Sequence, residues 1–231
     1  MRHEVATRRV LYEIPGMRSV KVRDAEFPAA DGRPLPMRIY DALTPIASPS
    51  PAVVLVAGYP DSGYRQHVGC DFMEIEWSIS MAQLIAASGM TAITHSNYDA
   101  EPDALALMDY IRQHGSLFGV NPGRVGVWAI SGSGPVAIAA MSKALCGVLI
   151  NPVAKERCPD RPAFVVRAGQ DQTPGLNAAL DRMFSLALAE NRPVTLVNYP
   201  EGPHAFDLFR DTSETRRILR QGLEFLRAHL V

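Results

Sequence analysis

The stretch Arg124-Val-Gly-Val-Trp-Ala-Ile-Ser-Gly-Ser-Gly-Pro-Val-Ala137 decides the fold that this chain is predicted to adopt. The apolar run Val125–Ile130 is typical of a buried strand, and the Ala-rich segment that opens at Gly132 is typical of a buried helix. Ser131 lies where the strand turns sharply into the helix. Such a turn holds a serine hydroxyl above the edge of a sheet, with backbone N–H groups close by. Ser131 is therefore the first candidate for a nucleophile.

Working outward, short apolar runs alternate with segments of helical spacing after residue 51. Continuously apolar strands separated by helices predict a mostly parallel sheet with helices on both faces, an α/β fold. Ahead of them, two extended segments within residues 20–40, joined around Asp31-Gly32, predict an antiparallel hairpin. The six expected core strands are Ala52–Ala57, Met90–Thr94, Val125–Ile130, Gly147–Ile150, Ala163–Ala168 and Val194–Tyr199.

Helix end signals locate several of the connecting helices. Gly89 suits the left-handed residue that ends the helix carrying Trp77 and Met81. Thr173-Pro174 suits a helix start, because proline at the first helical position gives up an N–H that would be unpaired there. Asp211-Thr-Ser-Glu214 is a candidate cap for the last helix.

Length and composition predict one α/β domain spanning 1–231, with residues 1–19 as an N-terminal extension. The chain has 231 residues, of which 47% are apolar, enough for one sizeable core. A formal net charge of -1 gives no bulk electrostatic reason to bind nucleic acid or an anionic membrane, so we expect a small-molecule partner. No segment has the pattern of a secretory signal or a membrane span, which predicts a soluble, cytoplasmic protein.

The cysteines and histidines predict neither a disulfide framework nor a metal site. Cys70, Cys146 and Cys158 are an odd, unpatterned set without a C-x-x-C pair. The chain has no H-E-x-x-H or comparable cluster. We therefore expect a protein that needs no metal and no cofactor.

Two further side chains with catalytic chemistry follow predicted strands. Asp171 comes just after the run Ala163–Ala168, and His204 comes on a loop after Val194–Tyr199. The carboxyl ends of parallel strands lie at one edge of a sheet, where ligands bind. Ser131, Asp171 and His204 are therefore expected at the same edge.

Each of the three has a distinct task in acyl transfer. Ser131 must lose a proton to attack a carbonyl carbon, and His204 can take that proton near neutral pH and return it to the leaving group. Asp171 would hold the imidazole in the required tautomer and stabilise the imidazolium. The backbone N–H groups of Gly132 and of Tyr59, which follows the first core strand, are candidates for the oxyanion hole.

The chain from about residue 20 to its end resembles the α/β-hydrolase superfamily, and within it the dienelactone-hydrolase-like and small serine esterase branch. This resemblance implies a carboxylesterase-type enzyme in which Ser131, Asp171 and His204 form the triad and an acyl-serine intermediate forms. It also implies that no cofactor is used. The matching segments are Val-Leu-Val-Ala-Gly-Tyr-Pro at 54–60, Arg-Val-Gly-Val-Trp-Ala-Ile-Ser at 124–131, Arg-Ala-Gly-Gln-Asp at 167–171 and Gly-Pro-His-Ala-Phe at 202–206.

The chain departs from the family pattern in three ways. Ala129 and Ser133 stand where the usual G-x-S-x-G elbow has glycines; both are small, so the turn should form with some added strain. Dienelactone hydrolases carry cysteine as the nucleophile, so the serine here favours a general carboxylesterase. Only a short link, Asn151–Pro162, stands where many relatives insert a helical cap, which predicts an open and shallow site.

Two other functions stay open at this stage. Gly132-Ser-Gly-Pro-Val-Ala137 also fits G-x-G-x-x-A after a strand, the pattern of a dinucleotide-binding turn in an oxidoreductase. Against it, the turn lies midway along the sheet, and the next strand ends at Asn151 with no acid to hold a ribose. The second alternative is a hydrolase-fold protein that binds a small molecule without turnover.

Several polar residues near the predicted site are not assigned to catalysis. His95 follows a strand and is interpreted as structural. His67 and Cys70 lie near the oxyanion loop, and their spacing assigns them no role. Asp207 is expected to support the loop of His204 rather than to replace Asp171.

Overall fold

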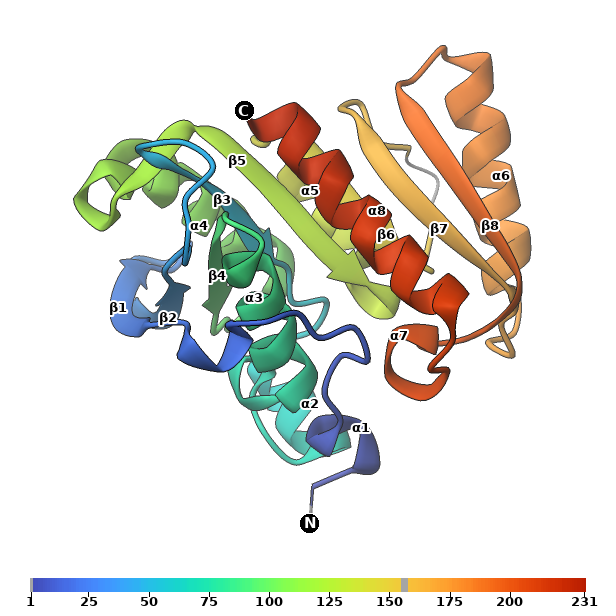
Figure 1. Ribbon diagram of the computed structural model, residues 1–231, viewed down its shortest axis with the longest axis horizontal. Helices are drawn as coiled ribbons and strands as arrows, with labels where there is room; N and C mark the ends of the chain where they lie inside the picture. Colours follow the sequence, from blue (N-terminus) through green and yellow to red (C-terminus); the bar gives the residue numbers. More distant parts are fainter. Residues whose placement is uncertain (1, 155–157) are drawn as a thin grey trace.

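In the computed structural model, which describes residues 2–154 and 158–231, eight strands form one twisted sheet with helices on both faces (Figure 1). The strand order is β1-β2-β4-β3-β5-β6-β7-β8. The strands are β1 (Val22–Pro28), β2 (Pro34–Tyr40), β3 (Ser50–Leu55), β4 (Thr91–His95), β5 (Val120–Ile130), β6 (Cys146–Ile150), β7 (Ala163–Gln170) and β8 (Val194–Pro203).

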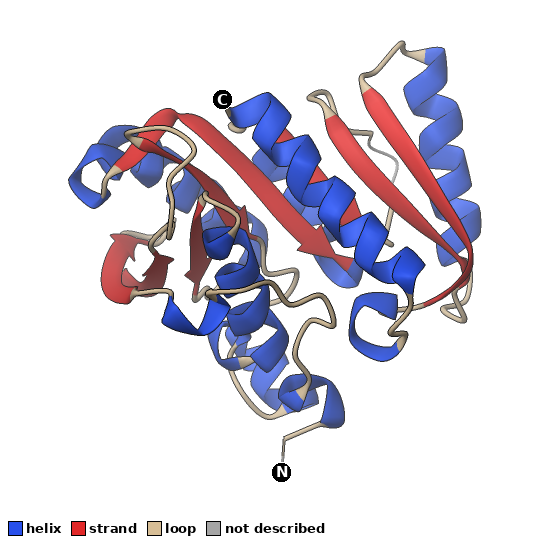
Figure 2. Cartoon of the chain, in the orientation of Figure 1, coloured by secondary structure: helices blue, strands red, loops and turns tan. Residues whose placement is uncertain are grey.

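The predicted hairpin and the predicted parallel sheet are both present (Figure 2). Strands β1 and β2 pair antiparallel from Val22 opposite Tyr40 to Pro28 opposite Pro34, and Gly32 takes a positive φ of 83° in the turn between them. Strand β2 pairs antiparallel with β4, and every pairing from β4 onward is parallel. Among the strands described, only β2 therefore runs against the direction of the rest, so the carboxyl ends of β3 to β8 share one edge.

The helices divide between the two faces of the sheet. Helices α3 and α8 pack on one face, where Trp128 is fully buried, and α4, α5 and α6 pack on the other. Gly222 lets α8 approach closely, because a Cβ there would lie 2.9 Å from the Trp128 ring. The helices are α1 (Glu4–Thr7), α2 (Asp61–Val68), α3 (Glu76–Ala87), α4 (Ala100–His114), α5 (Gly134–Met141), α6 (Leu176–Ala189), α7 (Phe206–Phe209) and α8 (Ser213–Leu230).

Helix ends follow the expected signals, with one shift. Thr212 caps α8 by accepting a hydrogen bond from the Thr215 N–H at 3.1 Å, and Gly89 takes a φ of 96° after α3. Helix α6 begins at Leu176, two residues later than Thr173-Pro174 predicted. The reason is that the Thr173 N–H donates to the Asp171 carboxylate at 2.8 Å, which closes a turn ahead of the helix.

The N-terminal extension packs against the body of the protein rather than trailing from it. Helix α1 lies beside α2 and α3 (Figure 1), and Ala6 and Val10 are buried. The Val10 N–H donates to Ser80 Oγ on α3 at 2.9 Å. These buried contacts fix residues 3–14 over one end of the sheet.

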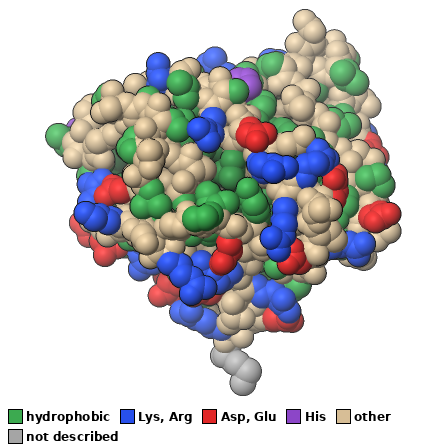
Figure 3. All heavy atoms as spheres, viewed as in Figure 1, with side chains coloured by type: hydrophobic (Ala, Val, Ile, Leu, Met, Phe, Trp, Pro, Cys, Tyr) green, Lys and Arg blue, Asp and Glu red, His purple; other side chains and the backbone are tan. Residues whose placement is uncertain are grey.

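Charges of both signs are spread over the surface. Figure 3 shows Lys and Arg side chains interspersed with Asp and Glu side chains on the face that carries α3 and α8. Several of them pair, as Arg216 does with Asp211 and Arg217 with Glu214. Among the helices that the structure describes, none has the length and apolar character needed to cross a membrane.

Candidate functional site

Strand register brings the predicted acid and the predicted base side by side. Strands β7 and β8 are parallel neighbours, and Gln170 at the end of β7 lies opposite Pro203 at the end of β8. Asp171 and His204 therefore leave the sheet at adjacent points. A register shift between Ala168 and Gln170 produces this alignment, because β8 carries two more residues than β7 between these pairings.

The three predicted site residues form one hydrogen-bonded chain. Ser131 Oγ lies 2.9 Å from His204 Nε2, and His204 Nδ1 lies 2.6 Å from Asp171 Oδ2. The Asp171 side chain has no exposed surface, whereas that of His204 is 28% exposed. A carboxylate only accepts hydrogen bonds, so Nδ1 carries the proton and Nε2 is free to accept the proton of the serine hydroxyl.

Ser131 occupies a strained turn, as the elbow pattern implied. Its φ of 51° lies in the left-handed region, which costs a residue with a side chain about 1 kcal/mol or more. The Val153 N–H donates to the Ser131 carbonyl at 2.8 Å, and a Cβ on Gly134 would lie 2.5 Å from the Val153 carbonyl oxygen. The backbone of the loop after β6 thus packs directly against the backbone of the turn. These contacts compensate for the strain.

The oxyanion candidates, Tyr59 and Gly132, lie on two loops packed against each other. A Cβ on Gly58 would lie 2.5 Å from the Gly132 carbonyl oxygen, so only glycine fits between the loops. The Gly58 N–H donates to the Tyr64 hydroxyl at 3.1 Å. Within the described residues, neither the Tyr59 N–H nor the Gly132 N–H donates to another part of the chain. Both remain available to a ligand oxygen.

Tyr64 contacts and supports the loop that carries Gly58 and Tyr59, a role for which the sequence carried no signal. Its ring packs edge-on against Tyr59 with a centroid distance of 5.9 Å. Desolvation by burial raises the pKa of Tyr64 to about 12. The phenol therefore stays protonated and can accept the Gly58 N–H throughout the pH range in which proteins are stable.

Replacing Gly58 by alanine is expected to lower kcat by about 10²–10³, the usual effect of losing one oxyanion donor. The new Cβ would force the Gly132 backbone away and separate the two candidate donors. Steady-state kinetics with a p-nitrophenyl ester measures the loss. Gly63→Ala on α2 is the matched control, since its Cβ meets only Tyr59 Cβ at 3.8 Å. Equal kcat in the two variants would contradict the assignment.

An apolar cavity of about 290 Å³ opens beside Ser131 and His204. None of the residues that line it is Lys, Arg, Asp or Glu. Its walls come from α1, the segment 59–77, the end of β5 and α7, and they include Val5, Val68, Phe72, Ile75, Trp77 and Leu208. The cavity can house an apolar group joined to a carbonyl at Ser131.

The expectation of an open and shallow site did not include the N-terminal extension, which contributes to the cavity lining. The described part of the link 151–162 holds no helix, as predicted, yet Val5 of α1 lines the cavity. The His3 N–H donates to the Val68 carbonyl at 3.0 Å, which ties α1 to the end of α2. The N-terminal extension thus supplies part of one wall of the cavity. Sequence reasoning missed Val5 and Trp77, because neither carries a local signal that connects it to Ser131.

None of the secondary candidates lines this cavity. His67 is exposed on α2, and Cys70 is buried; neither lines it. Asp207 is buried and bonds Trp77 rather than His204, which agrees with a supporting role. His95 is fully buried, with its ring edge-on to Phe27, as its structural interpretation expected.

His95 is expected to make the protein less stable as the pH falls. Burial lowers the pKa of His95 from 6.5 to about 4, so the neutral form stabilises the fold above pH 6.5. As the pH falls from 6.5 toward 4, the unfolded chain binds a proton at His95 that the folded protein does not bind. The free energy of unfolding is therefore expected to decrease by about 2 kcal/mol by pH 4.5. Urea unfolding at pH 7 and pH 4.5 should show this loss in the wild type and not in His95→Gln. The same loss in both proteins would refute the prediction.

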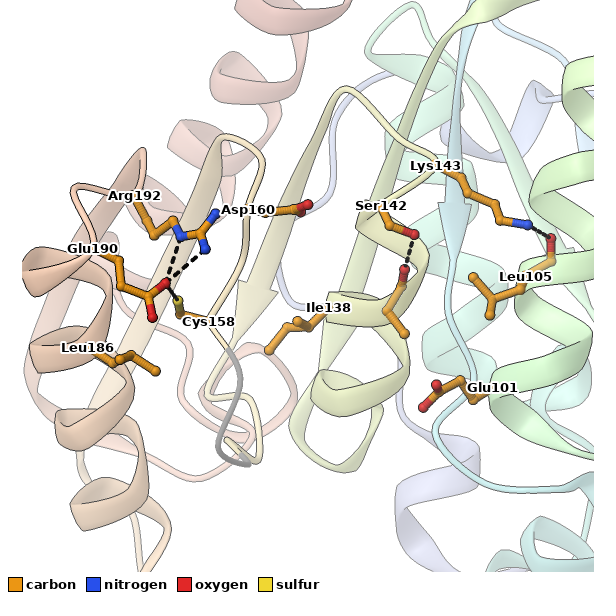
Figure 4. A pocket seen from close by; sticks show the side chains of 11 residues that line it. Glu101, Leu105, Ile138, Ser142, Lys143, Cys158, Asp160, Leu186, Glu190 and Arg192 are labelled. Carbon is orange, nitrogen blue, oxygen red and sulfur yellow. Dashed lines mark hydrogen bonds and ion pairs between the residues drawn. The ribbon is translucent and has the colours of Figure 1, made fainter.

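Two larger cavities, of about 500 Å³ each, lie away from Ser131. Figure 4 shows one of them, where Glu190 pairs with Arg192 and the Ser142 hydroxyl donates to a carbonyl of its own helix. These groups, like Lys143, which pairs with Asp109, thus already bond within the protein. Across residues 2–154 and 158–231, no group of three His, Cys, Asp or Glu side chains could hold a metal ion.

Comparisons with known proteins identify the fold. No family model matches the chain, and no curated protein matches its sequence. Among solved structures, a bacterial heroin esterase superposes with a TM-score of 0.74 at 15% identity, covering 96% of this chain and 87% of that one. An α/β hydrolase from the metagenome of Lake Arreo, Spain, gives 0.72 at 17% identity, covering 90% and 82%. EstE1, a thermostable carboxylesterase from a metagenomic library, gives 0.71 at 16% identity, covering 91% and 90%.

These similarities extend over nearly the whole chain, and the identities are too low to carry an activity across. They agree with the mixed eight-stranded sheet and the helices around it. The chain therefore has an α/β-hydrolase fold.

Proposed function

We propose that this protein is a carboxylesterase that cleaves a neutral ester of a small molecule through an acyl-Ser131 intermediate. The observation that carries the proposal is the hydrogen-bonded chain from Ser131 Oγ through His204 to Asp171, at 2.9 and 2.6 Å. Nucleophile, base and orienting acid in contact at one sheet edge are the parts that acyl transfer requires. Solved structures with this fold include a carboxylesterase and a bacterial heroin esterase, which point the same way.

Acylation would start with attack of Ser131 Oγ on the ester carbonyl carbon while its proton passes to His204 Nε2. Negative charge on the carbonyl oxygen would meet the N–H groups of Tyr59 and Gly132. When the tetrahedral intermediate collapses, the carbon–oxygen bond to the alcohol breaks and His204 gives its proton to the departing alkoxide. The acyl group remains on Ser131.

Deacylation would repeat these steps with water as the nucleophile. His204 takes a proton from a water molecule as its oxygen attacks the acyl carbon, and the same two N–H groups hold the oxyanion. The bond to Ser131 Oγ then breaks, and the serine regains its proton from His204. Asp171 accepts from Nδ1 throughout and compensates the charge of the imidazolium.

The cavity favours a neutral, apolar substituent on one side of the ester. Burying an unpaired charge costs several kcal/mol, and the lining residues offer no Lys, Arg, Asp or Glu to pair with one. This lining and the serine nucleophile support a general carboxylesterase of the dienelactone-hydrolase-like and small serine esterase branch, rather than a dienelactone hydrolase proper.

The test combines an activity-based probe with a substrate series. A fluorophosphonate should label the wild-type protein once, and peptide mapping should find the label on Ser131. The p-nitrophenyl esters of acetic, hexanoic and palmitic acids should be hydrolysed with the lowest KM for hexanoate, which fits the cavity best. Label on another residue, or no hydrolysis of any activated ester, would contradict the proposal.

The two rival functions predict different results. A dinucleotide-binding turn needs open space beside its glycines, whereas a Cβ on Gly132 would lie 2.5 Å from the Tyr59 hydroxyl and one on Gly134 would meet Val153. Titration with NADH followed by fluorescence should therefore show no binding. A binding protein without turnover would retain an ester in equilibrium dialysis while releasing no acid.

A further inference from the structure

A second carboxylate lies fully buried close to His204. Asp207 is on α7, and its Oδ2 accepts a hydrogen bond from the Trp77 indole N–H at 2.6 Å. Within the described residues its Oδ1 has no hydrogen-bond partner. Burying a carboxylate with incomplete hydrogen bonding costs several kcal/mol, so the position needs a compensating benefit.

The partner of Asp207 is a wall of the cavity. Trp77 lies in the first turn of α3, is 4% exposed, and lines the cavity that Ser131 and His204 share. Leu208, next to Asp207 in the chain, lines the same cavity from α7. The hydrogen bond therefore ties two walls together, although α3 and α7 are far apart in the sequence.

The N-terminal extension, which contributes to the cavity wall, is bound to the backbone of Asp207. The Leu11 N–H donates to the Asp207 carbonyl at 2.9 Å. The N-terminal extension, whose Val5 lines the cavity, is thus bound to the backbone of the residue that holds Trp77. Asp207 therefore accepts hydrogen bonds from both Trp77 and the N-terminal extension.

We propose that Asp207 is a positioning residue that, by holding the Trp77 indole, sets which ester substituents the cavity accepts. The inference rests on the proposed ester hydrolysis. With the N–H held by Asp207, Trp77 turns only its apolar ring toward the substituent. Without that acceptor, the indole would either bury an unpaired N–H or rotate and present it to an apolar chain, and either outcome disfavours a filled cavity.

Charge supports this arrangement near neutral pH. Burial raises the pKa of Asp207 to about 6, while the hydrogen bond from Trp77 and the nearby His204 act in the opposite direction. At pH 7 the group is therefore mainly a carboxylate, which can only accept. It matches the indole, which can only donate.

The experiment compares kcat/KM for p-nitrophenyl hexanoate with that for the acetate in single and double variants. Trp77→Phe and Asp207→Leu should each lower the hexanoate-to-acetate ratio about tenfold, through KM, because each leaves one buried polar partner unpaired. The double variant should recover the ratio to within about threefold, since no polar partner is left. Asp207→Asn should keep the ratio, because its amide oxygen can still accept from Trp77.

Asp103→Asn is the matched control for the loss of a buried carboxylate. Asp103 is 2% exposed on α4 and accepts backbone N–H bonds from Tyr98 and Asp99 at 2.7 and 2.9 Å. We expect a lower unfolding midpoint and an unchanged ratio. If Trp77→Phe and Asp207→Leu behave in the same way, Asp207 only stabilises the fold and the inference is overturned.

The outcomes separate this inference from the proposed function. If the fluorophosphonate labels Ser131 but Trp77→Phe and Asp207→Leu keep the hexanoate-to-acetate ratio of the wild type, only the role of Asp207 is overturned. A wild-type protein that neither labels nor hydrolyses esters would overturn both. If Asp207→Leu does not fold, Trp77→Phe against Asp207→Asn decides, since only the first should lower the ratio.

Discussion

Replacing Ser131 by alanine is expected to lower kcat for a p-nitrophenyl ester by about 10⁵–10⁶, with KM little changed. The hydroxyl lies 2.9 Å from His204 Nε2, and no acyl intermediate can form without it. The remaining rate would come from the oxyanion donors and from substrate binding alone. Steady-state kinetics, with fluorophosphonate labelling in parallel, measures both losses.

The neighbouring Ser133 provides the control for this prediction. Ser133 is 3% exposed and lies beyond the turn, so Ser133→Ala should still take up the phosphonate label at Ser131. The alanine at position 131 replaces a residue that already has a φ of 51°, so the unfolding midpoint should stay close to that of the wild type. Full activity in Ser131→Ala would rule out the proposed nucleophile.

Replacing Asp171 by asparagine is expected to lower kcat by about 10⁴. Asp171 Oδ2 accepts the His204 Nδ1 proton at 2.6 Å and so leaves Nε2 unprotonated toward Ser131. An asparagine amide can donate to Nδ1 instead, which favours the tautomer with the proton on Nε2. That tautomer cannot accept the serine proton. Kinetics over a range of pH would report the loss.

Asp181→Asn is the matched surface control for Asp171→Asn. The Asp181 carboxylate is 55% exposed on α6 and pairs with Arg167, so its loss should leave kcat within about threefold of the wild type. A comparable, small effect of both substitutions would mean that Asp171 does not orient His204.

Local patterns predicted much of the fold because they reflect local physics. Five of the six apolar runs became buried core strands, whereas Val194–Tyr199 was wrongly expected in the core: it lies in β8, an edge strand with mostly exposed side chains. Thr212 caps α8 because a threonine side chain can accept an N–H two or three residues ahead. The hairpin of residues 20–40 has its turn at Gly32, where glycine accepts a positive φ. Strand ends were less predictable: β8 runs on to Pro203, since its pairing with β7 resumes after a register shift.

The candidate site divides in the same way. The sequence predicted Ser131, Asp171 and His204 at one edge, because each follows a strand of an expected parallel sheet. The distances among them depend on the bulge near Gly169, where a Cβ would lie 2.4 Å from the Pro200 carbonyl oxygen. A glycine in a loop is common, so this close approach could not be recognised from the residue alone.

The cavity could not be predicted at all from neighbouring residues. Val5 and Trp77 line the same cavity although they lie far apart in the chain, and the hydrogen bond between Trp77 and Asp207 spans 130 residues. The prediction of an open site considered only the link 151–162, where relatives place a cap. The part of the wall that Val5 provides comes from the opposite end of the chain.

What the sequence by itself determined is the order of strands and helices and the identity of the side chains at their ends, since hydrophobic period, capping and turn chemistry act over a few residues. The tertiary structure alone decided how far Ser131 lies from His204, how the cavity is shaped and which segments line it. Those features arise where close packing forces distant segments into one arrangement. The strength of each such contact depends on partners that no short stretch of sequence contains.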